Sequence, residues 1–174
     1  MKQYYIHSIL AVLLVLSLAS YNPTTTGQIS LYNEFEEYRA EVIEPINDRA
    51  IKTAEKGGRY TTMLEETEEA FHYINEELIP YAAETRDLAL EAQDRLVNPE
   101  IQELNEILIE NLELTLESFT MTASMTEMNI PPIEDEKAVY EKTEKIYAEL
   151  MELQEEIDRT SAEYEKRVEE LAAN

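Results

Sequence analysis

The residues Glu69-Ala-Phe-His72 have a spacing that can bind a metal ion. Residues three apart project from the same side of a helix, and di-iron bundles use two such Glu-x-x-His pairs, on two helices, to hold metal in their core. The chain has one other histidine, His7, which lies in an apolar N-terminal segment. Phe71, rather than His72, falls on the expected buried stripe of its helix. We therefore expect His72 at the surface and predict no metal ligands, so a metal-dependent bundle enzyme is the most remote of the functions considered.

Other residue types that carry chemistry are absent or uninformative. The chain has no cysteine, which excludes disulfides, thiolate nucleophiles and cysteine metal sites. It has neither a glycine-rich phosphate loop nor an Asp-x-Asp-x-Asp-Gly calcium loop, and acid–base catalysis would rest on Glu alone. Acidic runs such as Glu65–Glu69 are typical of solvated helix faces that bind divalent cations weakly at most. We predict a protein that is not an enzyme, with no catalytic residues and no cofactor.

The charge balance excludes some partners. Against 14 Lys and Arg there are 38 Asp and Glu, giving a net charge of -24. Such a surface repels nucleic acid and anionic lipid headgroups, so we expect no nucleic-acid partner. With 44% hydrophobic residues, the 174-residue chain is nevertheless suited to one folded domain with a real core rather than to an acidic disordered tail.

The N-terminal segment has the parts of a secretory signal peptide, which we assign to residues 1–19. Lys2 precedes the apolar run Ile9–Leu18, and Ser17 and Ala19 are the small residues that a cut after Ala19 requires. An uncut membrane anchor and a buried helix of a cytosolic protein are the alternatives, and any membrane contact is expected through this segment alone. Residues 20–27 are predicted to be a linker. The expected location is extracytoplasmic, either secreted or attached to the outer face of the cell membrane.

Residues 28–174 carry the patterns of four helices and almost no strand signal. The first is expected over Ile29–Lys56, kinked by Pro45 and capped by Gly57. The second is expected to start with a capping box at Thr62 and to kink near residues 75–79, before Pro80.

The third and fourth helices have equally clear boundaries. Asn98 and Pro99 are a favoured cap and first residue, and the acidic residues Glu134–Glu136 suit the start of the last helix. Apolar residues recur at three- and four-residue spacing, typical of coiled-coil-like packing. Because the links are short, we predict an all-α fold: an antiparallel up-down four-helix bundle of long helices, plus the N-terminal signal or anchor helix.

One stretch of the acidic domain is almost uncharged. Between Ser118 and Ile133 the single charged residue is Glu127. Methionine side chains adapt to varied partners, so a partner-contact site is a candidate function for this stretch, and completion of the bundle core by the methionines is the alternative. The candidate contact residues are Met121, Met125, Met128, Ile130 and Pro132.

A resemblance to a known family spans the layout of the chain. It rests on the leader, the polar linker and two predicted helices, NEELIPYAAETRDLALEAQDRL and NPEIQELNEILIENLELTLESF. The chain resembles the small, Glu-rich, helical extracytoplasmic proteins and lipoproteins of low-GC Gram-positive bacteria, some of which are described as cell-wall-binding. It departs from them at Tyr21, where a lipoprotein has the cysteine that carries the lipid. The resemblance implies no functional residues.

The expected function is that of a non-catalytic exported or surface-tethered helical bundle. It is expected to act through contact with unidentified proteins or as a structural element of the envelope. The alternative is an extracytoplasmic helper that holds client proteins in a chaperone-like manner or binds divalent cations weakly.

Overall fold

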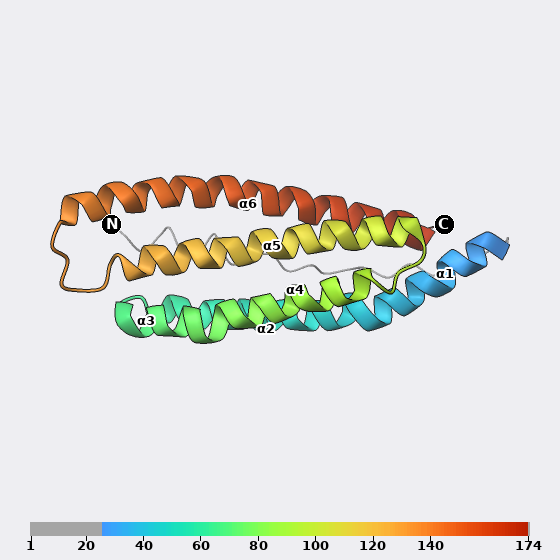
Figure 1. Ribbon diagram of the computed structural model, residues 1–174, viewed down its shortest axis with the longest axis horizontal. Helices are drawn as coiled ribbons and strands as arrows, with labels where there is room; N and C mark the ends of the chain where they lie inside the picture. Colours follow the sequence, from blue (N-terminus) through green and yellow to red (C-terminus); the bar gives the residue numbers. More distant parts are fainter. Residues whose placement is uncertain (1–25, 174) are drawn as a thin grey trace.

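The computed structural model describes residues 26–173, which form four helical stretches joined by three links (Figure 1). No strand occurs within these residues, and the prediction of an all-α chain is confirmed. The predicted signal peptide or anchor, residues 1–19, and most of the predicted linker lie outside the described residues. Among the helices that are described, none combines the length and the hydropathy needed to cross a membrane.

The first two stretches are each interrupted by a π-helical turn. The first consists of α1 (Thr26–Tyr38), the π-helix Arg39–Ile43 and α2 (Glu44–Thr62). The second consists of α3 (Thr67–Tyr73), the π-helix Ile74–Leu78 and α4 (Ile79–Gln93). The third and fourth are single helices, α5 (Pro99–Glu127) and α6 (Glu136–Ala173).

Both π-helical turns end two residues before a proline, Pro45 in α2 and Pro80 in α4. Proline has no N–H to donate, and its ring clashes with the carbonyl four residues back, so the turn before it widens. The deviation expected near residues 75–79 is therefore found at Ile74–Leu78, and Pro45 bends the first stretch in the same way.

The link between the first two stretches differs from the prediction. Gly57 does not cap a helix, because α2 continues through it to Thr62, and no described residue has a positive φ angle. Thr62 does not begin the next helix either: its hydroxyl bonds to the carbonyl of Arg59, and α3 starts at Thr67. The cause is Tyr60, which is buried and whose hydroxyl lies 2.5 Å from the hydroxyl of Thr126 on α5. Anchoring this last turn offsets the cost of about 1 kcal/mol for a glycine inside a helix.

The start of α5 is as predicted. The Asn98 side chain accepts a hydrogen bond from the backbone N–H of Glu100 (2.9 Å), and Pro99 is the first helical residue. At the start of α6, Asp135 accepts a hydrogen bond from the N–H of Ala138 (3.0 Å). Both side chains satisfy backbone donors that a helix start leaves unpaired.

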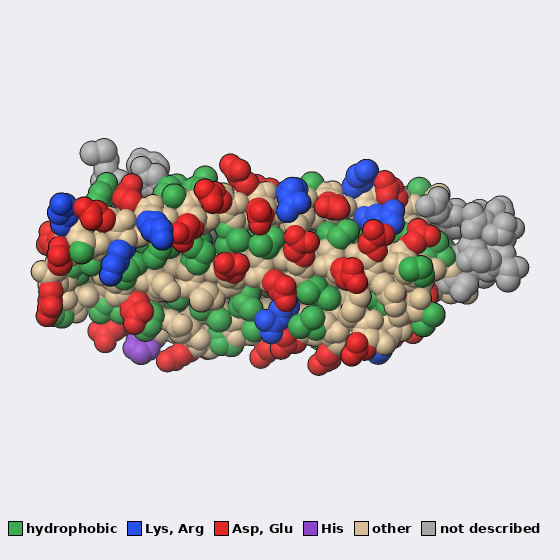
Figure 2. Space-filling model, turned by 45° about the horizontal axis from the view of Figure 1, so that its top comes forward, with side chains coloured by type: hydrophobic (Ala, Val, Ile, Leu, Met, Phe, Trp, Pro, Cys, Tyr) green, Lys and Arg blue, Asp and Glu red, His purple; other side chains and the backbone are tan. Residues whose placement is uncertain are grey.

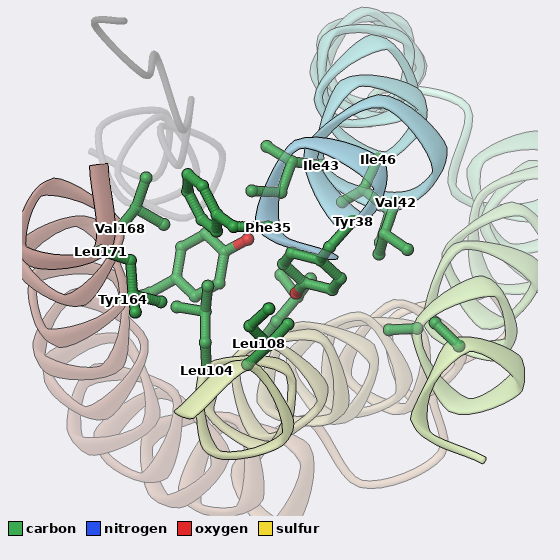
Figure 3. Close-up of a cluster of buried hydrophobic side chains, with 13 residues drawn as sticks. Phe35, Tyr38, Val42, Ile43, Ile46, Leu104, Leu108, Tyr164, Val168 and Leu171 are labelled. Atoms are coloured by element: carbon green, nitrogen blue, oxygen red, sulfur yellow. The ribbon is translucent and has the colours of Figure 1, made fainter. Parts of the chain in front are cut away.

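The core is divided into two clusters, and only the first of them contains residues of α6. The first cluster, at the end of the molecule where α6 terminates, is shown in Figure 3; it comprises Phe35, Tyr38, Val42, Ile43, Ile46, Ala89, Ala92, Ile101, Leu104, Leu108, Tyr164, Val168 and Leu171. The second cluster draws on the first three stretches alone; it comprises Tyr60, Ala70, Ile74, Leu78, Ala82, Phe119 and Ala123. The N-terminal half of α6 therefore adds nothing to the second cluster.

Candidate functional site

The helix α6 has fewer neighbours than the last helix of a closed bundle. It lies beside α5 along its length (Figure 1), and among the described elements its backbone approaches only α5 and α1 within 8 Å. In a closed four-helix bundle the first and last helices are neighbours along their length. Here α2, which continues the first stretch, makes no such approach to α6.

The burial of α6 changes along its length in agreement with this arrangement. Towards its C-terminus the apolar stripe is buried at Leu150, Ile157, Tyr164 and Val168. Between residues 136 and 149 no residue is buried, and Val139 on the same stripe is only half-buried. Tyr140 is 58% exposed and Met151 is 40% exposed. The first part of α6 thus presents apolar surface that the described chain does not cover.

The uncovered side of α6 can be located from its contacts with α5. Arg159 and Arg167 pair with Glu110 and Glu103 of α5, at 3.9 and 2.9 Å, which fixes the side of α6 turned towards that helix. The side next to it carries Tyr140, Thr143 and Met151, at spacings of three and eight residues. The hydroxyl of Thr143 is buried without a hydrogen-bond partner within the described residues.

A matching side of α2 is identified in the same way. Arg49 and Lys56 contact α4 through Glu84 and Glu77, so the opposite side of α2 faces away from α4. That side carries mostly small residues at spacings of four, three and four, namely Asn47, Ile51, Ala54 and Gly58. Ile51 is 49% exposed, and a Cβ added at Gly58 would meet nothing within 4 Å.

Between these two helices lies a stripe of α5 with short hydroxyl side chains. Thr126 joins α5 to α2 through Tyr60, and Asn111 joins α5 to α6 through Thr160 (2.7 Å). The hydroxyls of Thr115 and Thr122 between them bond to carbonyls of their own helix, at 2.9 and 2.8 Å; Thr115 is half-buried and Thr122 is buried. We call these three strips the α2–α6 seam; its residues are Asn47, Ile51, Ala54, Gly58, Thr115, Tyr140, Thr143 and Met151.

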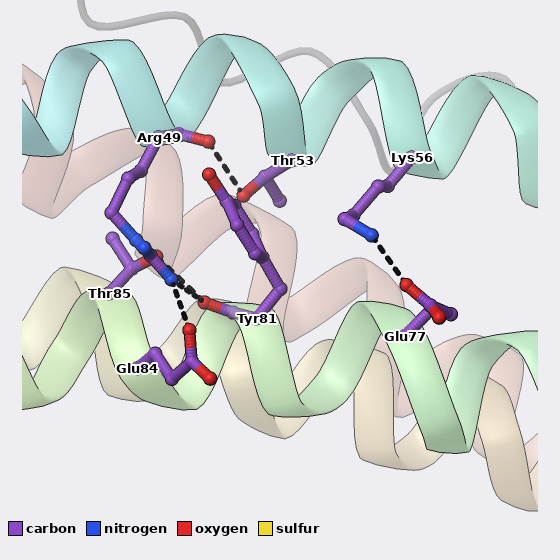
Figure 4. Close-up of polar contacts among 7 residues, drawn as sticks. All are labelled: Arg49, Thr53, Lys56, Glu77, Tyr81, Glu84 and Thr85. Carbon is purple, nitrogen blue, oxygen red and sulfur yellow. Dashed lines mark hydrogen bonds and ion pairs between the residues drawn. The ribbon is translucent and has the colours of Figure 1, made fainter.

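The packing of α2 on α4, which sets one wall of the seam, depends on Arg49 (Figure 4). Its Nε donates to the hydroxyl of Thr85 (2.8 Å), and its Nη2 donates to the carbonyl of Tyr81 (3.0 Å) and to the Glu84 carboxylate (2.9 Å). The guanidinium also lies 4.0 Å from the centre of the Tyr81 ring. Further along, Lys56 contacts Glu77 at 2.8 Å. This pairing lowers the pKa of the Glu77 carboxyl.

The methionines predicted from the sequence lie on the side of α5 that carries Glu103 and Glu110, and therefore face α6. Met121, Met125 and Met128 are all half-buried there. Ile130 is half-buried and Pro132 exposed in the link between α5 and α6, at the same end of the molecule as the link between α2 and α3 (Figure 1). The structure thus aligns the methionines with the α5–α6 contact and separates them from the two link residues.

The Glu-x-x-His sequence does not form a metal-binding arrangement. His72 and Glu69 are both exposed, and the His72 Nδ1 lies 3.3 Å from the carboxylate of Glu76. Within residues 26–173 no group of three or more His, Asp and Glu side chains is placed to hold a metal ion. A hydrogen bond between the carboxyls of Glu66 and Glu69 raises the pKa of Glu66.

The visible surface agrees with the composition: acidic side chains are spread over the face in Figure 2, with small hydrophobic patches between them.

The seam residues were not predicted as a site. The apolar stripe of α6 is continuous from Val139 to Leu171, and nothing along that stripe indicates that its first part lacks a neighbour.

Comparison of the chain with protein-family models, with curated proteins and with solved structures finds no match.

Proposed function

We propose that the protein is a non-catalytic, exported helical bundle that binds another protein through the α2–α6 seam. The observation that supports this most directly is that the N-terminal half of α6 packs against α5 but has no second helix beside it among the described elements. An apolar helix side that the chain leaves uncovered, in an otherwise strongly acidic molecule, is typical of a surface that another molecule covers. The seam is long and narrow and bordered by two helices, which suits an amphipathic or apolar helix as the bound element.

The proposed architecture is an antiparallel up-down bundle. The series of contacts supports it: along α5 and α6, Glu103 contacts Arg167 whereas Asn111 contacts Thr160, so residue numbers rise on one helix as they fall on the other. The contacts of Arg49 with Glu84 and of Lys56 with Glu77 follow the same rule for α2 and α4. The two ends of the seam therefore differ, and a bound helix has a defined direction.

The proposed location is extracytoplasmic, with export directed by residues 1–19 and the chain either released or tethered to the outer face of the membrane. A net charge of -24 favours a protein partner over nucleic acid or an anionic lipid surface. The partner would act as a ligand of the seam, and no catalytic step is proposed.

The proposal can be tested by site-specific photo-crosslinking in the native host, followed by fractionation. A photo-reactive amino acid in place of Tyr140 is expected to give a protein adduct in the extracytoplasmic fraction. The matched control replaces Glu91, an exposed residue of α4 outside the seam, and is expected to give none. Equal labelling at the two positions would contradict binding through the seam. Recovery of the protein from the cytosol alone would contradict export.

A further inference from the structure

We propose that the apolar leader, residues 1–19, occupies the α2–α6 seam for as long as it remains attached to the chain. This inference names a second occupant for the surface in the proposed function and does not depend on any external partner.

The position of the chain end supports this assignment. The described chain begins at Thr26, at the end of the molecule where α6 terminates (Figure 1). Besides α5, the helix α1 is the one described element whose backbone approaches α6, and Asn47, the first seam residue on α2, lies about 32 Å from Thr26 along the first stretch. Pro23 lies in the intervening polar residues and suits the reversal of direction that is needed.

The length of the preceding segment is sufficient. At a rise of about 1.5 Å per residue, Gly58 lies about 48 Å along the first stretch from Thr26. Twenty-five residues span about 37 Å as a helix and up to about 85 Å when extended. A segment with a helical apolar part and an extended linker therefore reaches along the whole seam.

The chemistry of the leader also matches the seam. The seam presents the small residues Ala54 and Gly58 on α2, and a Cβ added at Gly58 would meet nothing within 4 Å, which suits the large apolar side chains of Ile9–Leu18. The leader contains no acidic residue, and its Lys2 would approach the end of the molecule where Glu134 and Glu136 are exposed. No salt bridge of the described residues uses either of these carboxylates.

A second copy of the chain is a poorer occupant. Each copy carries a net charge of -24, so bringing two seams together would set two strongly negative surfaces against each other. The leader brings apolar area without adding negative charge.

The absence of cysteine from the chain makes a disulfide experiment straightforward. In the full chain, in buffer without detergent, Leu14→Cys is combined with Asn47→Cys, the seam residue on α2 nearest to Thr26. The matched control combines Leu14→Cys with Leu90→Cys, a residue of α4 that is 40% exposed and lies outside the seam. Because docking raises the local concentration of the two thiols, the seam pair is expected to oxidise at least about tenfold faster than the control pair. Equal rates would overturn the inference.

A second measurement uses the chain that starts at Ser20. Removal of the leader is expected to increase the binding of an apolar fluorescent dye, whose emission rises on contact with exposed apolar surface. A Met151→Glu substitution in the shortened chain should abolish that increase, whereas Leu90→Glu should not. Unchanged dye binding on leader removal would overturn the inference. If the seam pair oxidises faster than the control pair but the photo-reactive residue at Tyr140 gives no adduct with a host protein, the proposed function alone is contradicted. If that residue gives an adduct but the two cysteine pairs oxidise at equal rates, this inference alone is contradicted.

Discussion

The hydroxyl of Tyr38 donates a hydrogen bond to the side-chain oxygen of Asn105 across 3.1 Å in the interior of the first core cluster. The Asn105 amide in turn donates to the carbonyl of Ala89 and to Gln93, so the three helical stretches that these residues represent are joined by one buried polar network. Tyr164 of α6 is buried in the same cluster (Figure 3); its hydroxyl makes no well-formed hydrogen bond among the described residues, although it lies close enough to the Tyr38 hydroxyl for each phenol to shift the pKa of the other. The two buried phenols are therefore in chemically different situations.

This difference predicts opposite effects of the same substitution. Tyr38→Phe leaves the oxygen of the fully buried Asn105 without its donor, and we expect a loss of about 1–2 kcal/mol in the free energy of unfolding. Tyr164→Phe removes a polar group that is already unpaired, and we expect no loss or a gain of up to about 1 kcal/mol. Urea denaturation of the two variants measures both values. A larger loss for Tyr164→Phe than for Tyr38→Phe would contradict the hydrogen-bond assignment.

The buried tyrosines also predict the behaviour of the protein in alkali. Burial raises the pKa of Tyr38, Tyr60 and Tyr164 above the ordinary value of 10.0. The unfolded chain therefore loses these protons first, and above pH 10 it binds fewer protons than the folded chain. Stability is fully present below pH 10 and falls as the pH rises further, by up to about 1.4 kcal/mol per pH unit for each tyrosine.

Denaturant titrations at pH 8, 10 and 11 test this expectation. The decline above pH 10 should be shallower in Tyr164→Phe, because that variant has one fewer raised phenol pKa. A decline of equal slope in this variant and the parent chain would show that Tyr164 does not contribute.

Much of the fold could be predicted because its signals are local. Asn98 and Pro99 define a helix start through atoms within two residues of each other, and the structure places the cap there. Pro80 widens the turn just before it for an equally local reason. Such features depend little on the remainder of the chain.

The errors occur where a distant contact overrides a local signal. Gly57 is a good helix cap by residue type, but the burial of Tyr60 against Thr126, 66 residues further on, keeps α2 helical beyond it. The candidate site was missed for a related reason. The stripe that contains Val139 and Ile157 is regular, yet only the path of α2 in space determines which part of it is covered.

Asn111 provides a test of the contact between α5 and α6. Its side-chain nitrogen lies 3.0 Å from the carbonyl of Ile157, 2.7 Å from the Thr160 hydroxyl and 2.9 Å from the Ser161 hydroxyl. Asn111→Ala removes these interactions and leaves a small cavity, and we expect a loss of about 2–3 kcal/mol in the free energy of unfolding.

The matched control is Asn75→Ala, since Asn75 is exposed and bonds only within its own helix, to the carbonyl of Phe71. We expect this substitution to change stability by less than about 0.5 kcal/mol. Thermal or urea unfolding of both variants measures the difference, and similar values for the two would mean that the buried amide does not hold α6 to α5.

Arg49 and Lys56 contact the same helix from the same side of α2, but they differ in the number and quality of their contacts. The guanidinium of Arg49 makes three hydrogen bonds and stacks on Tyr81 at 4.0 Å, whereas Lys56 makes one ion pair with the exposed Glu77 and lies farther from the Tyr81 ring, at 5.3 Å. Because a lysine cannot reproduce the planar fork, Arg49→Lys is expected to lower the free energy of unfolding by about 1–2 kcal/mol. Lys56→Ala is expected to cost less than about 1 kcal/mol, as is usual for a surface pair. Raising the salt concentration should reduce the effect of Lys56→Ala more than that of Arg49→Lys, and equal sensitivity would indicate that Arg49 acts through charge alone.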